Sequence, residues 1–176
     1  MGAFPKSAEF FASILILVSA VFLSELLIHS YFFSASAPSK PEISRDQLEM
    51  AINSRIDLPD VDWAERPQTL VLALQTTCGY CNRSAPFYRR LIANTAGKNV
   101  RLLVVIPGDI EESRAHMEKL GLKNLDIRAV SLESIRVDGT PTLLLVNARG
   151  EVTDFWIGKL PPDVEAEVIH KVTSET

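Results

Sequence analysis

Two hydrophobic patterns divide the chain into regions that need separate interpretations. Residues 10–33 are almost continuously apolar and contain one charged residue, Glu25. A stretch of this length can cross a bilayer, for which about 20 residues are enough. The remaining sequence alternates apolar runs of strand length with apolar positions at helical spacing, which is typical of an α/β domain. We therefore expect a tail, a transmembrane anchor, a linker with a short helix, and a folded domain at residues 1–9, 10–33, 34–59 and 60–176.

The apolar stretch has a second interpretation, a cleaved signal peptide. Ala35-Ser36-Ala37 has the small-x-small form of a cleavage site. Pro38 would directly follow the cut, however, and the stretch is longer than the ~7–15 residues usual for the apolar part of a signal peptide. The length favours an uncleaved anchor. Because Lys6 precedes the span and the next basic residue is Lys40, the positive-inside bias places the domain on the extracytoplasmic, periplasmic side.

Within the domain, apolar runs predict the strands of one sheet. Residues 70–74 form a continuous apolar run, as in a strand that is buried on both faces. Residues 100–106 form the next run, and the helix between the two completes a unit whose strands should be parallel. Shorter strands are predicted around Val61 and Trp63 and at residues 127–130, 142–146 and 151–157, of which the last two should form a hairpin.

Between these strands, residues at helical spacing and helix-capping residues predict helices. Phe87 and Leu91 are spaced as on one face of a helix that follows the first strand. Asp109 and Glu112 form a capping pattern before a second helix, and Pro162 stands near the start of a third. The order of elements predicts an α/β fold with a central sheet and helices on both faces.

Charge and metal-ligand content exclude two classes of function. The formal net charge is -4 at pH 7, and the acidic and basic residues are interspersed without the basic run of a nucleic-acid-binding protein. Nucleic acid is therefore not an expected partner. A structural zinc site usually takes four ligands, whereas this chain has two cysteines and scattered histidines, so no metal is expected.

The two cysteines carry the clearest chemical signal. Cys78 and Cys81 are separated by Gly79 and Tyr80, at the point where the first strand leads into a helix. A thiolate at a helix N-terminus is stabilised by the free backbone N–H groups, and the second sulfur lies one turn further along. The spacing therefore predicts a dithiol in which Cys78 attacks a disulfide and Cys81 resolves the mixed disulfide. A purely structural disulfide would close a very small loop and contribute little.

The arrangement of motifs resembles the thioredoxin superfamily over roughly residues 61–172. The sequence Cys78-Gly79-Tyr80-Cys81 follows a buried strand, Pro86 stands five residues after the second cysteine, and Gly139-Thr140-Pro141-Thr142 precedes a hairpin. The resemblance implies a thioredoxin-like fold and a cis Pro141 opposite the cysteines. It also assigns Tyr80, Thr140 and Pro141 to substrate binding and Gly79 and Pro86 to support of the site, where Pro86 would kink the helix.

Two finer resemblances suggest a role. The helix and strand inserted at residues 109–130 are similar to those of membrane-anchored TlpA/ResA-type thioredoxins, whereas the Gly79-Tyr80 dipeptide and Thr140 are similar to DsbC-type disulfide isomerases. Both imply a cofactor-free enzyme that reduces or isomerises disulfides of cysteine-containing exported proteins. In an oxidising compartment such an enzyme needs electrons from a membrane donor of the DsbD or CcdA type.

The chain departs from the thioredoxin pattern at two positions beside the site. Thr77 precedes the first cysteine where thioredoxins usually carry tryptophan, and Leu72 occupies the position of a buried acid. No obvious residue replaces this acid as a proton acceptor for Cys81. Three alternatives stay open: a thiol peroxidase, for which Val71 and Gln75 are unsuitable residues, a copper-handling protein, and a binding module or chaperone.

Overall fold

The computed structural model describes residue 19 and residues 52–174. All the elements below belong to the unit Ser44–Thr176. Apart from residue 19, the predicted anchor at residues 10–33 lies outside the described residues, as does most of the predicted linker and short helix. Among the residues that are described, no helix combines the length and the apolar character that a membrane span requires.

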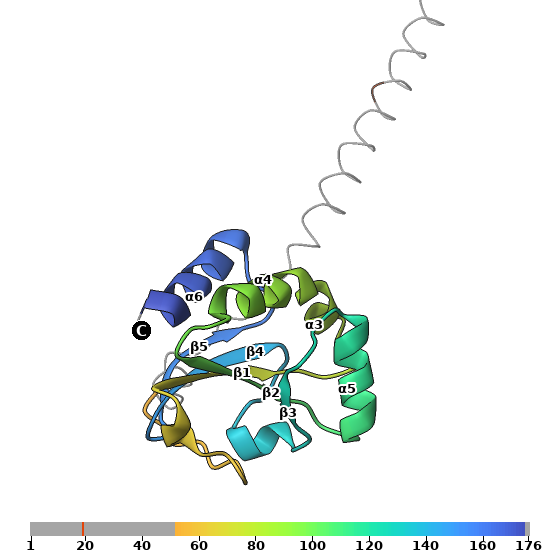
Figure 1. The fold of residues 1–176 in the computed structure, drawn as a ribbon. Helices are drawn as coiled ribbons and strands as arrows, with labels where there is room; N and C mark the ends of the chain where they lie inside the picture. The colour runs from red at the N-terminus through yellow and green to blue at the C-terminus, as the bar shows by residue number, and fades with distance from the viewer. Residues whose placement is uncertain (1–18, 20–51, 175–176) are drawn as a thin grey trace, which may run out of the picture. The chain divides into compact units, whose positions relative to one another are not determined.

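A five-stranded mixed sheet forms the centre of the domain (Figure 1). Its strands are ordered β3-β2-β1-β4-β5. The central strand β1 pairs in parallel with β2 and antiparallel with β4, while β3 extends the parallel side and β5 the antiparallel side. The bounds are Gln68–Ala73 for β1, Val100–Val105 for β2, Asp126–Arg128 for β3, Thr142–Asn147 for β4 and Val152–Ile157 for β5. The predicted α/β class, parallel pair and hairpin are therefore confirmed.

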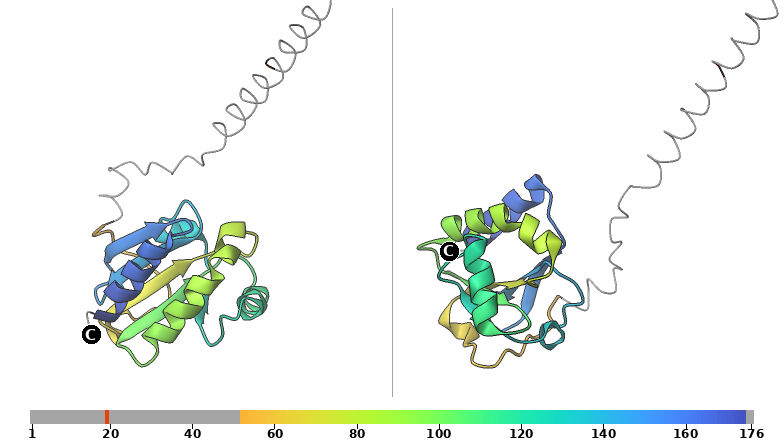
Figure 2. Two further views of the ribbon diagram at one scale, coloured as in Figure 1. Left: turned by 90° about the horizontal axis from the view of Figure 1, so that it is seen from above. Right: turned by 90° about the vertical axis from the view of Figure 1, so that its right-hand side faces the viewer.

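The α-helices and the 3-10 helices contribute to different faces of the sheet. The helices α4 and α6 lie beside each other over one face (Figure 2), and a core cluster there also takes in residues of α5. The 3-10 helices η1 and η2 pack on the other face. The bounds are Gly79–Arg83 for α3, Ala85–Thr95 for α4, Ile110–Lys119 for α5, Pro162–Ser174 for α6, Trp63–Glu65 for η1 and Leu132–Ile135 for η2.

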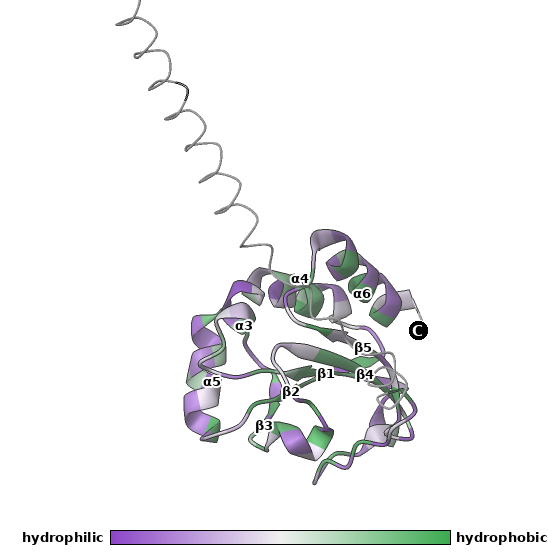
Figure 3. Cartoon of the chain, turned by 180° about the vertical axis from the view of Figure 1, so that it is seen from behind, coloured by the Kyte–Doolittle hydropathy of each residue, from purple (hydrophilic) through white to green (hydrophobic). Residues whose placement is uncertain are grey.

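The alternation of side chains along β1 explains its continuous apolar sequence. Leu70 and Leu72 belong to the core cluster beneath α4 and α6, whereas Val71 and Ala73 belong to the cluster on the opposite face. Successive side chains of a strand point to opposite faces, so a strand covered on both sides must be apolar throughout. Figure 3 shows the resulting hydrophobic colour of β1 and β4.

One predicted strand is wrong. No strand forms around Val61 and Trp63. Trp63 instead begins the 3-10 helix η1, which is capped by the Asp62 carboxylate as it accepts a hydrogen bond from the Ala64 N–H at 3.0 Å. Trp63 is buried by this turn. Its indole lies against Gly150, where an added Cβ would come within 2.9 Å of the ring at a backbone φ of +78°. Trp63 is therefore apolar because it is buried in a 3-10 turn, and not because it belongs to a strand.

The packed structure extends on the N-terminal side of Asp60. Asn53 and Ile56 donate backbone hydrogen bonds of 2.8 Å to Val152 and Gly150 in the β4–β5 hairpin, and Arg55 forms an isolated bridge with Glu151. The Ile56 side chain is 3% exposed in the core. This short segment thereby closes the outer side of the hairpin.

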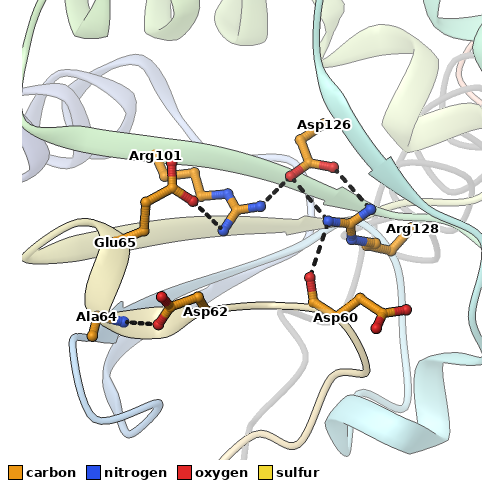
Figure 4. Close-up of polar contacts among 7 residues, drawn as sticks. All are labelled: Asp60, Asp62, Ala64, Glu65, Arg101, Asp126 and Arg128. Carbon is orange, nitrogen blue, oxygen red and sulfur yellow. Dashed lines mark hydrogen bonds and ion pairs between the residues drawn. The ribbon is translucent and has the colours of Figure 1, made fainter.

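Ion pairs connect η1 to the parallel side of the sheet (Figure 4). Asp126 on β3 pairs with Arg101 on β2 and with Arg128 at 3.4 Å. Arg101 also reaches the carboxylate of Glu65 at 3.3 Å, and Arg128 donates to the carbonyl oxygen of Asp60 at 3.3 Å. Asp126 is thus the acidic residue that Arg101 and Arg128 share.

Replacing this shared carboxylate should destabilise the domain. Because the Arg101 and Asp126 side chains are 15% and 30% exposed, Asp126→Asn should lower the free energy of unfolding by about 1–2 kcal/mol, between the values for exposed and buried pairs. Urea denaturation of the purified protein measures this. The matched control is Arg149→Gln, which removes an arginine with a 77% exposed side chain and should leave the midpoint unchanged. An equal effect of both substitutions would contradict the assignment.

Candidate functional site

Cys78 occupies the predicted junction between a buried strand and a helix. It follows β1 in the sequence and caps α3, where its sulfur accepts a hydrogen bond from the Cys81 backbone N–H at 3.1 Å. The Cys78 N–H in turn donates to the Gln75 carbonyl oxygen at 3.2 Å. These two bonds hold the sulfur at the free N–H groups of the helix, where negative charge is favoured.

The helix that carries the two cysteines is interrupted at Ser84, between α3 and α4. The Ser84 N–H donates to the carbonyl oxygens of Tyr80 at 3.0 Å and Cys81 at 3.2 Å, which closes α3. Pro86 stands in the first turn of α4, where its missing N–H leaves no intrahelical hydrogen bond unmade. The structure thus places Pro86 at the bend that the sequence predicts.

The surroundings of the Cys78 sulfur favour its thiolate. Burial alone opposes ionisation, but hydrogen bonds from the side chains of Cys81 and Thr140 and from the backbone N–H groups of Cys81 and Tyr80 outweigh it and lower the pKa of Cys78. The residue is partly exposed, so the thiolate is open to a disulfide from solvent. Hydrogen bonding to the charged form is the effect that decides the sign of the shift.

Cys81 has the opposite character. It is 2% exposed, and burial together with the hydrogen bond to the Cys78 side chain raises its pKa to about 12. Leu72, which is 1% exposed, supplies no carboxylate beside it. At neutral pH the buried sulfur is therefore a thiol next to the more acidic sulfur of Cys78, as the predicted roles require.

The loop before β4 brings Thr140 and Pro141 to the cysteines. The Thr140–Pro141 peptide bond is cis, and the Cys78 thiol donates to the Thr140 carbonyl oxygen at 3.4 Å. Pairing of β1 with β4 places Ala73 opposite Thr142, so the two loops leave the sheet at the same edge. The predicted cis geometry and its proximity to Cys78 are confirmed.

Tyr80 and Arg83 form an exposed pair beside the reactive sulfur. Tyr80 is 54% exposed, and the guanidinium carbon of Arg83 lies 4.4 Å from the centre of its ring, a cation–π contact. A Cβ at Gly79 would lie 3.4 Å from Arg83 Nη1, in van der Waals contact with the end of that side chain. Arg83 thus stacks on the exposed ring of Tyr80.

Sequence reasoning did not identify three residues of this site. Gln75 accepts a hydrogen bond from the Thr140 hydroxyl at 3.4 Å, which connects the two loops. Ser84 and Tyr88 carry buried hydroxyls behind Cys81. The sequence signal that could have identified Ser84 and Tyr88 is their helical spacing from Cys81, which they follow by three and seven residues. Among the described residues, no group of three or more His, Cys, Asp or Glu side chains is placed to hold a metal ion.

Comparisons with known proteins identify the fold. No family model matches the sequence, and no curated protein matches it. Solved structures do match. The thioredoxin domain of a thiol-disulfide oxidoreductase from Bacteroides vulgatus aligns with a TM-score of 0.54 and 18% identity over 70% of this chain and 98% of that domain. The fold is thioredoxin-like.

Two further structures support the thioredoxin-like fold. A thiol-disulfide isomerase from Corynebacterium glutamicum aligns with a TM-score of 0.53 and 15% identity over 71% of this chain and 94% of its own. StoA from Bacillus subtilis aligns with a TM-score of 0.51 and 16% identity over 60% of this chain and 82% of its own. At such identities the likeness establishes the fold.

The hydrogen bond from the Cys81 side chain to the Cys78 sulfur has a measurable consequence. Cys81→Ala removes the donor and should raise the pKa of Cys78, because one of the bonds that lower it is lost. Cys81→Ser keeps a hydroxyl donor and should retain more of the effect. Since Cys78 is then the only cysteine, the pH dependence of iodoacetamide alkylation reports on it alone. Slower alkylation of the Ala variant at neutral pH is expected; identical profiles would contradict the account.

Proposed function

We propose that this chain is a thiol-disulfide oxidoreductase that reduces or isomerises disulfides of exported proteins. The observation that carries the proposal is the asymmetry of the cysteine pair. One sulfur is accessible and has a lowered pKa, and the other is buried with a pKa raised to about 12. This division suits one attacking and one resolving sulfur.

The reaction follows from this asymmetry. The Cys78 thiolate attacks one sulfur of a client disulfide, which forms a mixed disulfide and releases the first client thiolate. Cys81 then attacks the Cys78 sulfur, which closes the Cys78–Cys81 disulfide and releases the second client thiolate together with the Cys81 proton. Two electrons pass from the pair to the client. In isomerisation, the released client thiolate attacks another disulfide of the client, and the thiolate freed there attacks the mixed disulfide. This second attack forms a new client disulfide and releases Cys78 as a thiolate.

The loop at Thr140 supports client binding. Its backbone lies at the sulfur of Cys78, so an extended client segment that pairs with it would present a disulfide to the nucleophile. Tyr80, which stands between the two cysteines in the sequence, offers exposed aromatic surface. We propose that Tyr80, Thr140 and Pro141 form the client-binding surface, with Gly79 and Pro86 supporting the helix that carries the sulfurs.

The proposed place of action is the periplasmic side of a membrane. The apolar residues 10–33 would anchor the domain there, in a compartment where an unassisted dithiol becomes oxidised. The enzyme would then draw electrons from a thiol transporter of the DsbD or CcdA type, and anchoring would raise its concentration near that partner. Several similar structures are described as thiol:disulfide interchange proteins, which agrees with this proposal.

Trapping of clients tests the roles of the two sulfurs. Cys81→Ser should accumulate mixed disulfides with exported proteins, because the first attack proceeds and resolution does not. Cys78→Ser should accumulate none. Non-reducing electrophoresis after acid quenching measures this, and a reducing lane serves as the control. Equal trapping by both variants would overturn the assignment.

The redox state in cells tests the direction of electron flow. In wild-type cells that are acid-quenched and alkylated, Cys78 and Cys81 should be found mainly as dithiols. A strain that lacks the electron transporter should hold them as a disulfide. A disulfide in both strains would contradict the reductive proposal and favour an oxidant.

A further inference from the structure

Two buried hydroxyls near the redox pair in the sequence have no hydrogen-bond partner apart from each other. Among the described residues, they are the Ser84 Oγ and the Tyr88 hydroxyl, on side chains of residues that are 3% and 1% exposed. Buried hydroxyls are nearly always paired, because an unpaired one loses its bond to water and gains nothing in return. These two groups therefore call for an explanation beyond packing.

The positions of the two hydroxyls relate them to the resolving sulfur. Ser84 and Tyr88 follow Cys81 by three and seven residues, so the three side chains lie on one face of the bent helix formed by α3 and α4. Cys81 and Tyr88 belong to the same core cluster, together with Leu72. The spacing thus places two hydroxyls on the helix face that carries the buried sulfur, within an otherwise apolar core.

The chemistry of Cys81 needs polar groups at this place. The buried thiol must become a thiolate before it can attack the mixed disulfide, and burial disfavours that charge. Leu72 provides neither a charge nor a hydrogen bond. A hydroxyl that donates to the thiolate would stabilise it in the absence of a buried acid.

We propose that the hydroxyls of Tyr88 and Ser84 are positioning donors that stabilise the Cys81 thiolate during the resolving step. This inference rests on the proposed function. Both hydroxyls keep their protons throughout. The proton of Cys81 leaves with the departing client thiolate, while the electron pair of the Cys81 sulfur forms the new bond to Cys78.

The charged groups around Tyr88 agree with a donor role. Burial raises the pKa of the Tyr88 phenol, and the negative charges of Cys81, Cys78 and Glu165 raise it further, while the Ser84 hydroxyl acts in the opposite sense. Glu165 on α6 is itself held by an ion pair with Arg90 on α4. The phenol therefore stays protonated across the working pH range. As a protonated group it can donate a hydrogen bond to a nearby thiolate.

A two-phase assay separates the two sulfurs. Reduced protein mixed with dithiobis(nitrobenzoate) releases one thionitrobenzoate when Cys78 attacks and a second when Cys81 resolves. Tyr88→Phe should leave the first phase unchanged and slow the second about tenfold at neutral pH, the scale of one hydrogen bond to a charged group. The difference in second-phase rate between the wild type and Tyr88→Phe should become smaller as the pH rises, because the Cys81 thiolate then forms without the hydrogen bond. Ser84→Ala should act in the same direction.

The control is another buried hydroxyl on α4. Thr95 is 6% exposed and donates to the Leu91 carbonyl oxygen at 2.9 Å. Thr95→Val should lower the unfolding midpoint and leave both phases unchanged, whereas Tyr88→Phe should leave the midpoint unchanged or raised. A second phase of wild-type rate in both Tyr88→Phe and Ser84→Ala, or equal slowing of both phases, would overturn the inference. A wild-type protein with no second phase would instead refute the proposed function.

Discussion

The Cys81 backbone N–H points at the Cys78 sulfur from 3.1 Å because Cys78 caps α3. In the proposed reaction this contact decides which sulfur attacks first, because it stabilises negative charge on Cys78. Cys81 lies one helical turn further along, in the core. Burial then raises the pKa of the inner sulfur, and hydrogen bonds lower that of the outer one. The same short helix thus provides one partly exposed sulfur with a lowered pKa and one buried thiol, the pair that the proposed exchange requires.

The sheet determines what faces this pair. Antiparallel pairing of β1 with β4 brings the segment before β4 to the edge where β1 ends, so residues that are distant in the sequence meet at the sulfurs. The Thr140 carbonyl reaches Cys78, and the Gln75 side chain contacts the Thr140 hydroxyl. The apolar character of β1 on both faces and the geometry of the site are therefore consequences of one topology.

Local rules predicted the parts of this molecule that depend on neighbouring residues. The apolar run of β1, the Asp109 cap of α5 and the bend at Pro86 all follow from sequence patterns within a few residues. Contacts between distant segments were beyond such rules. Trp63 was misread as part of a strand because its burial depends on Gly150. No local pattern marks Tyr88 as a residue whose hydroxyl is buried in the core cluster that contains Cys81.

The equilibrium redox potential of the Cys78–Cys81 pair tests the central claim most directly. Equilibration in glutathione buffers, with alkylation of the remaining thiols, should give a reversible two-electron transition between about −270 and −120 mV, the range of dithiol oxidoreductases. A disulfide that forms only irreversibly, or one with a potential below about −300 mV as in structural disulfides, would contradict a catalytic role for the pair.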